Sequence, residues 1–243
     1  MLPTALRQNL SALLGRASYN SDGLISFHGA DFLFDPRFCQ SYREGVARLG
    51  KEVHIEWRVR VSLWAARAAM KLEGDFVECG VNTGIMAGSI MDDLHWATRA
   101  PRRFWLLDTF EGLPTEGLST TSIAAVKALN VNYTNVYEMV HQYFSRYPNV
   151  SLVRGRVPET LTEVVVDRVA FVSLDMNVPE PEIAAGEYFW PRMVPGAMMV
   201  LDDYNFVGCE AQRPAWDQFA ARHGIDILPL PTGQGLIIKP PGS

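Results

Sequence analysis

Short apolar runs alternate with helical stretches from residue 75 to near the end of the chain, and this alternation limits the folds that the sequence can adopt. Most runs carry β-branched or aromatic residues at consecutive positions, which is typical of strands buried on both faces. The runs are Asp75–Cys79, Phe104–Leu107, Val150–Val153, Val169–Leu174, Ala197–Leu201, Ile225–Leu230 and Leu236–Ile238. Helical periodicity lies between them, over Ile85–Ala97, Ser122–Arg146, Pro179–Met193 and Cys209–His223. The pattern predicts an α/β fold, an open parallel sheet with helices on both faces.

The N-terminal part of the chain has no comparable pattern. We expect a short helix over Thr4–Leu14, irregular chain rich in aromatic residues up to about residue 50, and a helix between Val53 and Leu72. The sequence therefore predicts an N-terminal extension over residues 1–52 and one main domain over residues 53–243. The extension is expected to be a lid over a ligand or an interface in a homo-oligomer.

Composition excludes several classes of function. The net charge of −5 argues against a nucleic-acid or anionic-membrane partner, because either would need a clustered basic surface. No apolar run reaches the roughly 18 residues of a membrane span, and residues 1–15 lack the apolar core of a secretory signal. The three cysteines are odd in number and widely spaced, so we expect free thiols and a cytoplasmic protein.

The first buried strand leads into a glycine-containing loop with the sequence Glu78-Cys-Gly80-Val-Asn-Thr83-Gly84. In open α/β sheets the turn after the first strand lies at the point where the strand order reverses, and ligands bind there. The loop lacks the third glycine of dinucleotide-binding loops, which disfavours an NAD-dependent oxidoreductase. A plain glycine-rich turn with a solvated Glu78 is the alternative.

An acid ends the second buried strand, in Leu107-Asp108-Thr109, and Gly112 and Pro114 then interrupt the chain. At this position a carboxylate lies beside the first loop and can accept hydrogen bonds from both hydroxyls of a ribose. We therefore predict a nucleoside-containing cofactor that lacks a diphosphate.

Three further acids end two later strands, Asp175 after the fourth and the pair Asp202–Asp203 after the fifth. If these strands are neighbours, the acids meet at one edge of the sheet. Each carboxylate pair about 5 Å apart then costs roughly 3 kcal/mol at an effective dielectric constant near 20. A cation would offset this repulsion, and hard oxygen ligands favour Mg²⁺. Solvated loop acids are the alternative. Of Asp202 and Asp203, one could also support a ligand without contacting the ion, or cap the next segment.

These stretches together resemble the macrocin O-methyltransferase family, which uses Mg²⁺ and S-adenosylmethionine to methylate sugars. The resemblance rests on Gly74–Val81, Leu107–Pro114 and Asp202–Tyr204, with weaker similarity at Arg154-Gly155, Glu159–Leu161 and Pro195-Gly196. It implies the Rossmann-like fold of class I methyltransferases, with a seven-stranded, mostly parallel sheet whose last strand is antiparallel. The predicted cofactor contacts are Glu78, Gly80, Thr83, Gly84, Asp108, Thr109 and Arg154. The predicted metal ligands are Asp175, Asp202 and Asp203, and the metal would hold two adjacent sugar hydroxyls and acidify one.

One position departs from the family pattern. A second acid, a proposed general base, usually stands two residues after the acid of the fourth strand, and here that position is Asn177. An amide cannot take a proton at neutral pH, so the metal alone must acidify the hydroxyl or the base must come from elsewhere. We predict catalytic roles for His141 and Asp175, with His28 a weaker candidate base. The alternative for His141 is an exposed histidine on a helix.

The resemblance implies a small-molecule or oligosaccharide acceptor. The sequence also suggests a mannoside from the methylated mannose polysaccharide pathway of mycobacteria. Trp190, Tyr204 and Trp216 could stack on a sugar or pack in the core. Two alternatives stay open: a catechol-type O-methyltransferase acting on an aromatic diol, and a non-catalytic binding subunit of polysaccharide assembly.

Overall fold

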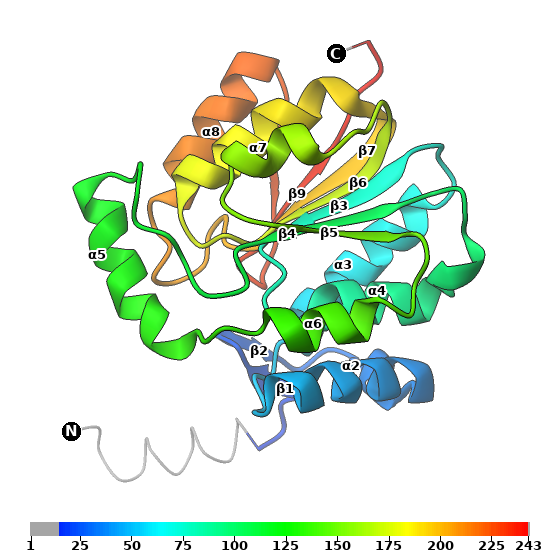
Figure 1. Ribbon diagram of the computed structural model, residues 1–243. Helices are drawn as coiled ribbons and strands as arrows, with labels where there is room; N and C mark the ends of the chain where they lie inside the picture. Colours follow the sequence, from blue (N-terminus) through cyan, green and yellow to red (C-terminus); the bar gives the residue numbers. More distant parts are fainter. Residues whose placement is uncertain (1–14, 243) are drawn as a thin grey trace, which may run out of the picture.

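The computed structural model describes residues 15–242, and the helix expected over Thr4–Leu14 lies outside this range. Its centre is a seven-stranded sheet with the strand order β5-β4-β3-β6-β7-β9-β8 (Figure 1). The parallel strands are β3 (Asp75–Cys79), β4 (Phe104–Asp108), β5 (Val150–Arg154), β6 (Val169–Leu174) and β7 (Met193–Leu201). The antiparallel strands are β8 (Leu228–Pro229) and β9 (Gly235–Ile238). The predicted mostly parallel sheet is confirmed.

Helices cover both faces of the sheet, as the alternating pattern predicts. One hydrophobic core contains Phe76, Phe104 and Phe171 and packs against helices on the side of α3 and α4. The other core contains Val77, Leu107 and Trp216 and lies under α7 and α8. The helices are α2 (Pro36–Leu49), α3 (Glu56–Ala69), α4 (Ile85–Leu94), α5 (Thr120–Leu129), α6 (Tyr137–Phe144), α7 (Pro179–Phe189) and α8 (Gln212–His223). Short 3₁₀ helices are η1 (Asp31–Phe34), η2 (Trp96–Thr98), η3 (Asn130–Asn132), η4 (Glu159–Glu163) and η5 (Trp190–Arg192).

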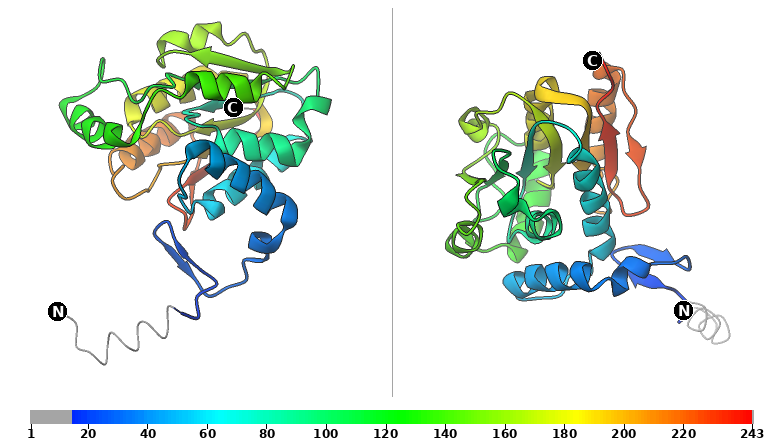
Figure 2. Two further views of the ribbon diagram at one scale, coloured as in Figure 1. Left: turned by 60° about the horizontal axis from the view of Figure 1, so that its bottom comes forward. Right: turned by 90° about the vertical axis from the view of Figure 1, so that its right-hand side faces the viewer.

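The expectation of irregular chain before residue 50 is wrong. Helix α2 lies there, with the Asp35 side chain accepting hydrogen bonds from the amides of Arg37 and Phe38 at its start. Gly50, in the left-handed conformation, ends it. Phe38 and Tyr42 are buried in the same core as α3 and α4. Figures 1 and 2 show α2 lying across one end of the domain.

A two-stranded hairpin precedes α2, formed by β1 (Tyr19–Ser21) and β2 (Leu24–Ser26). Its two-residue turn is Asp22-Gly23, and both residues have positive φ, at 53° and 73°. A two-residue hairpin turn with both φ angles positive is the type I′ turn, for which Asp-Gly is a preferred sequence. This hairpin was also not predicted.

Several predicted boundaries need correction. The helix expected over Ser122–Arg146 is two helices, α5 and α6. The Asn130 side chain accepts a hydrogen bond from the Leu113 amide and donates one to the Leu113 carbonyl, each at 2.8 Å, and the chain turns at this point. The strand expected over Ile225–Leu230 is only the two residues of β8. Strand β7 begins at Met193, four residues earlier than the expected Ala197, so the preceding helix ends at Phe189.

Candidate active site

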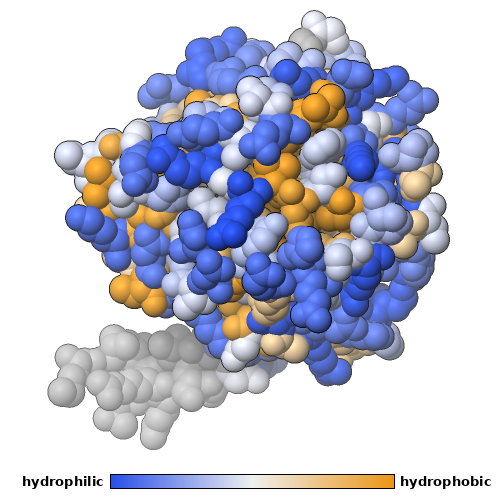
Figure 3. Space-filling model, in the orientation of Figure 1, coloured by the Kyte–Doolittle hydropathy of each residue, from blue (hydrophilic) through white to orange (hydrophobic). Residues whose placement is uncertain are grey.

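A hollow of about 850 Å³, open to solvent, lies at the carboxyl ends of the parallel strands. Its lining comes from the first loop, from the segments after β4, β5 and β6, and from the loop between α5 and α6. It includes Gly80, Asn82, Asp108, Thr109, Tyr133, Gly155 and Asp175. This is the edge at which open α/β sheets bind ligands. Figure 3 shows hydrophobic residues over α5, the helix beside this edge.

The first loop depends on two of its glycines. Gly80 has φ of +89°, and a Cβ atom there would lie 1.8 Å from the carbonyl oxygen of Asp175. Gly84 has φ of +77°, and its Cβ would lie 2.6 Å from the Phe144 ring. Positive φ and the absence of space both require glycine. The predicted loop is therefore a tight turn packed against β6 and α6, with Gly80 facing the hollow.

Arg48 of α2 supports this loop from behind. Its Nε donates to the carbonyl of Thr83 at 3.2 Å and its Nη2 donates to the carbonyl of Gly84 at 3.0 Å. The guanidinium carbon also lies 3.6 Å from the centre of the Tyr143 ring. Sequence reasoning missed this residue, because nothing in the pattern links the N-terminal segment to the glycine loop.

Glu78 is buried, which excludes the alternative of a solvated side chain in a plain turn. It accepts a hydrogen bond from the Ala87 amide, and burial raises the pKa of its carboxyl group well above the ordinary value. Its Oε2 atom has no hydrogen-bond partner among the described residues. A buried oxygen without a partner needs a proton or a donor from a ligand.

Asp108 lines the hollow as predicted, but its oxygens are engaged by the protein. Oδ2 accepts from the amides of Val81 at 2.6 Å and Asn82 at 2.7 Å. Oδ1 accepts from the Phe110 amide at 2.6 Å, while the Thr109 hydroxyl, 3.3 Å away, donates to the carbonyl of Gly112. Three backbone amides therefore bond the two oxygens of this carboxylate. In this structure Asp108 joins the first loop to the second, and its contact with a ribose remains a prediction.

Arg154 ends β5 and is exposed. It pairs with Glu111 at 3.2 Å and its guanidinium lies 4.4 Å from the centre of the Tyr137 ring. The residues from this segment that line the hollow are its neighbours Gly155, Arg156 and Val157. The cofactor contact predicted for Arg154 therefore falls next to the lining rather than in it.

The three predicted acids do come together. Strands β6 and β7 are paired with Leu174 opposite Leu201, so Asp175 and Asp202 are adjacent at the strand ends. Carboxylate oxygens of Asp175, Asp202 and Asp203 all lie within 4.8 Å of one another. Burial and the neighbouring acids raise the pKa of Asp175 well above its ordinary value and that of Asp203 to about 6. The group contains only hard oxygen donors, which fits Mg²⁺.

Asn177 bridges two of these acids. Its Nδ2 donates to Asp203 at 2.7 Å and to Asp175 at 3.2 Å. Its Oδ1 accepts from the Tyr133 hydroxyl at 2.8 Å. Where the family pattern has an acid, this chain therefore has an amide that donates to carboxylates.

Two residues that sequence reasoning missed hold Asp202. Arg58 of α3 donates from Nη1 to Asp202 Oδ2, and Gln234 donates from Nε2 to Asp202 Oδ1 at 2.8 Å. Asp202 is 1% exposed. The guanidinium is thus a fixed positive charge at the edge of the acid group.

The histidines are not part of this group. His141 is exposed on α6, with its ring 5.7 Å from that of Tyr137, and it lines a separate groove beside β5. The structure therefore matches the alternative of an exposed helical histidine, and His28 is exposed as well. Trp190, Tyr204 and Trp216 are buried in the core beneath α7 and α8, which is the packing alternative.

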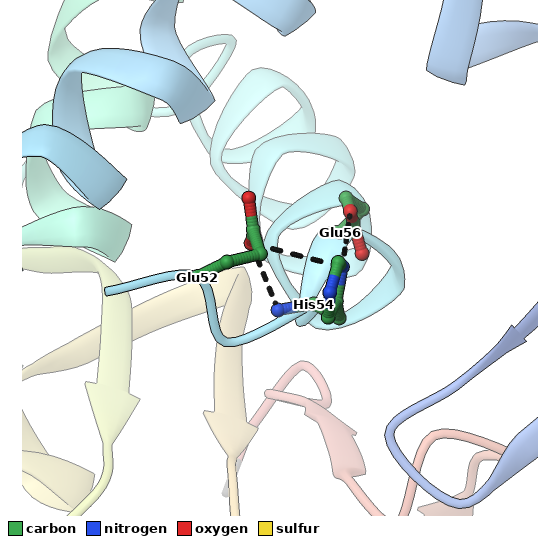
Figure 4. A group of neighbouring side chains, drawn as sticks. All are labelled: Glu52, His54 and Glu56. Atoms are coloured by element: carbon green, nitrogen blue, oxygen red, sulfur yellow. Dashed lines mark hydrogen bonds and ion pairs between the residues drawn. The ribbon is translucent and has the colours of Figure 1, made fainter.

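A second group with metal-binding side chains lies between α2 and α3, where Glu52, His54 and Glu56 point toward one another (Figure 4). Glu52 Oε1 already accepts from the Tyr42 hydroxyl at 2.8 Å and from the amides of Val53 and His54 at 3.0 Å. His54 and Glu52 are also exposed. We therefore interpret these side chains as stabilising the segment that connects α2 to α3, and not as a metal site.

Comparison with known proteins gives a consistent result. Residues 62–230 match the family described as macrocin O-methyltransferase (TylF). The 8-demethyl-8-(2,3-dimethoxy-α-L-rhamnosyl)-tetracenomycin-C 4′-O-methyltransferase of Streptomyces olivaceus is 30% identical over 160 residues, 63% of this chain and 60% of the relative. The mycinamicin III 3″-O-methyltransferase of Micromonospora griseorubida is 26% identical over 164 residues, 63% of this chain and 62% of the relative. The chain thus spans about 60% of the length of these curated relatives.

Solved structures share the fold. The O-methyltransferase NovP matches with a TM-score of 0.65 at 19% identity, covering 75% of this chain and 79% of NovP. The calicheamicin methyltransferase CalS11 matches with a TM-score of 0.59 at 17% identity, covering 99% of this chain and 93% of CalS11. Within residues 15–242, no helix has both the length and the apolar character needed to cross a membrane.

Proposed function

The chain belongs to the macrocin O-methyltransferase family, and from this premise we propose that it transfers the methyl group of S-adenosylmethionine to a hydroxyl of a sugar in a glycoside. The observation that carries the proposal is the acid group at the end of β6 and β7, beside a hollow bordered by the glycine loop. The names of two relatives that match this chain specify methylation of rhamnosyl-tetracenomycin and of mycinamicin III. These names support a glycoside as the class of acceptor.

The first loop and the segments after β4 and β5 form the side of the hollow that we assign to the cofactor. Gly80 contributes backbone to the lining of the hollow, and a side chain there would clash with the carbonyl of Asp175. Asp108 fixes the amides of Val81 and Asn82, which keeps this wall of the hollow in one conformation. Such a preorganised wall orients the reacting groups before the transfer.

Asp175, Asp202 and Asp203 are the residues that would hold Mg²⁺, because they offer three hard oxygen ligands within 4.8 Å. When bound, the ion lowers the pKa of a sugar hydroxyl and orients it. Asp175 is the one of the three that lines the hollow, so we propose that it would hold the ion beside the acceptor hydroxyl, whose proton can pass to solvent in the open hollow. Asn177 holds Asp175 and Asp203 in place and takes no proton.

The test is methyl transfer from radiolabelled S-adenosylmethionine by the purified chain. The acceptors are rhamnosides and mannosides, both simple methyl glycosides and glycosides of larger aglycones, together with catechol. We expect label in a glycoside, lost in EDTA and restored by Mg²⁺, and absent in the Asp203→Asn variant. The exposed Glu163→Gln variant serves as the control and should keep full activity.

Other outcomes contradict the proposal in different ways. Transfer only to catechol would replace the sugar with an aromatic diol as acceptor. Binding of S-adenosylmethionine by calorimetry without transfer to any acceptor would favour the non-catalytic binding subunit. Absence of binding would reject the methyltransferase function altogether.

A further inference from the structure

The tip of the N-terminal hairpin reaches the acid group through one arginine. Asp22, the first residue of the β1–β2 turn, contacts Arg58 with both carboxylate oxygens. Its Oδ2 accepts from Nε at 2.8 Å and its Oδ1 accepts from Nη2 at 3.3 Å. The side chains of Asp22 and Arg58 are only 10% and 14% exposed. A two-point contact of this kind sets the plane of a guanidinium as well as its position.

The remaining edge of the same guanidinium faces the candidate metal site. Arg58 Nη1 donates to Oδ2 of Asp202, one of the three predicted ligands. The Phe206 ring lies 4.8 Å from the guanidinium carbon, so an aromatic face covers part of the cation. Asp22 and Asp202 therefore occupy different nitrogen atoms of Arg58, and each restricts the orientation that is available to the other.

The base of the hairpin is held as firmly as its tip. The Tyr19 hydroxyl lies 2.6 Å from the carbonyl oxygen of His54 and 3.0 Å from Glu56 Oε2. Tyr19 is 7% exposed and its ring meets Trp57 edge to face. Because Trp57 and Arg58 are adjacent on α3, both ends of the hairpin are attached to the same turn of helix.

We propose that Asp22 is a positioning residue of the metal site: by fixing the guanidinium of Arg58 it fixes the carboxylate of Asp202. This inference rests on the proposed function, since it assigns Asp202 to the metal site of the methyltransferase. The N-terminal hairpin then belongs to the active site, although it lies some 180 positions from Asp202 along the chain.

Loss of the Asp22 carboxylate should weaken cation binding at the three aspartates in two ways. Removing its negative charge makes the region less attractive to a divalent cation. Arg58 is then free to turn both of its terminal nitrogens toward the acids, where it competes with a cation for Asp202. Both effects weaken metal binding. Changes in such supporting residues typically cost about 10- to 100-fold in metal affinity.

The Asp22→Asn variant tests this without disturbing the turn, because asparagine adopts the left-handed conformation of residue 22 at least as readily as aspartate. The matched control is Asp31→Asn, an exposed acid of the same N-terminal segment. The first measurement is amide hydrogen exchange on the full chain in EDTA. We expect residues 202–206 to exchange about fivefold faster or more in Asp22→Asn and unchanged in Asp31→Asn, since a released carboxylate loosens its segment. Faster exchange confined to residues 19–26 would overturn the proposal.

The second measurement is Mn²⁺ affinity by electron paramagnetic resonance, in a cycle with Arg58→Gln. We expect Asp22→Asn to weaken Mn²⁺ binding about tenfold in the natural sequence and less than about twofold in the Arg58→Gln background. An equal loss in both backgrounds would mean that Asp22 does not act through Arg58, and the inference would fail. If the natural sequence binds no Mn²⁺, the metal part of the proposed function is wrong, and the exchange experiment on the metal-free chain still decides whether Asp22 positions Asp202.

Discussion

The uncharged side chain of Asn177 stabilises two of the buried carboxylates. Its amide nitrogen donates to Asp175 and Asp203, so it offsets repulsion between the acids together with Arg58 and Gln234, which donate to Asp202. An Asn177→Asp change removes both donors and adds a fourth negative charge. The new carboxylate would face both Asp175 and Asp203, and each close pair of like charges costs roughly 3 kcal/mol. We therefore expect a free energy of unfolding lower by about 3–6 kcal/mol in EDTA. Urea denaturation measures it.

Magnesium should reverse most of this loss, because a divalent cation neutralises the added charge. The control is Asn132→Asp, an exposed position in η3, which should unfold like the natural sequence in either buffer. Equal stability of Asn177→Asp and the natural sequence in EDTA would show that the amide does not hold the acids together.

The acid group was predictable from sequence, and its surroundings were not. Asp175 and Asp202 directly follow strands that proved to be neighbours, and parallel strands end at one edge of the sheet. Arg58 lies 144 positions from Asp202 on a helix whose apolar spacing gives no sign of its ion pair. Asp108 was correctly expected beside the first loop, but the pattern could not show that the loop's own amides occupy its oxygens.

At the scale of the elements, the contact of helix α2 with the glycine loop matters most for the proposed function. Arg48 is the only described side chain that bonds the carbonyls of both Thr83 and Gly84. We expect Arg48→Ala to weaken S-adenosylhomocysteine binding about tenfold. Without Arg48 the loop is less ordered before binding, and ordering it would cost about 1.4 kcal/mol of the binding free energy. Isothermal titration calorimetry measures this, with Arg43→Ala, exposed on the same helix, as the control. Unchanged affinity would restrict Arg48 to a role in packing.

Element boundaries were predicted where apolar periodicity was strong and missed where side chains outside the pattern decided them. Asp35-Pro36 and Gly50 are recognisable start and stop signals of α2, but the aromatic residues around them obscured its amphipathic spacing. The break between α5 and α6 depends on Asn130 bonding Leu113 across 17 positions, which no local pattern reveals.

At the scale of the whole molecule, burial of several acids at one end of the sheet makes stability depend on pH. The pKa of Glu182 is raised to about 8 by burial, although it accepts hydrogen bonds from the Met176 amide and the Trp216 indole at 3.0 Å. The pKa values of Glu78 and Asp175 are also raised, and that of Asp203 is raised to about 6. An acid with a raised pKa binds more protons in the folded state than in the unfolded state, so its stabilisation is complete below its ordinary pKa and is lost as pH rises.

The free energy of unfolding in EDTA should therefore fall as pH rises from 5 through about 8. At about 1.4 kcal/mol for each unit of raised pKa, Glu182 alone accounts for a fall of up to roughly 4 kcal/mol. The Glu182→Gln variant leaves Met176 or Trp216 without an acceptor and should be about 1–3 kcal/mol less stable than the natural sequence at pH 5. Because its stability falls less steeply, this difference should close or reverse by pH 8. The exposed Glu163→Gln variant should follow the natural sequence.

Magnesium distinguishes the acids from one another in the same experiment. A cation bound by Asp175, Asp202 and Asp203 favours their ionised forms. It should therefore remove the part of the pH-dependent loss of stability that these three acids cause. Glu182 is outside that group, and burial is the largest cause of its raised pKa, so most of its share of the fall should persist. We thus expect Mg²⁺ to raise stability most above pH 6 while leaving a fall near pH 8 that Glu182→Gln removes. A curve unaltered by Mg²⁺ at any pH would mean that the three aspartates do not bind the ion.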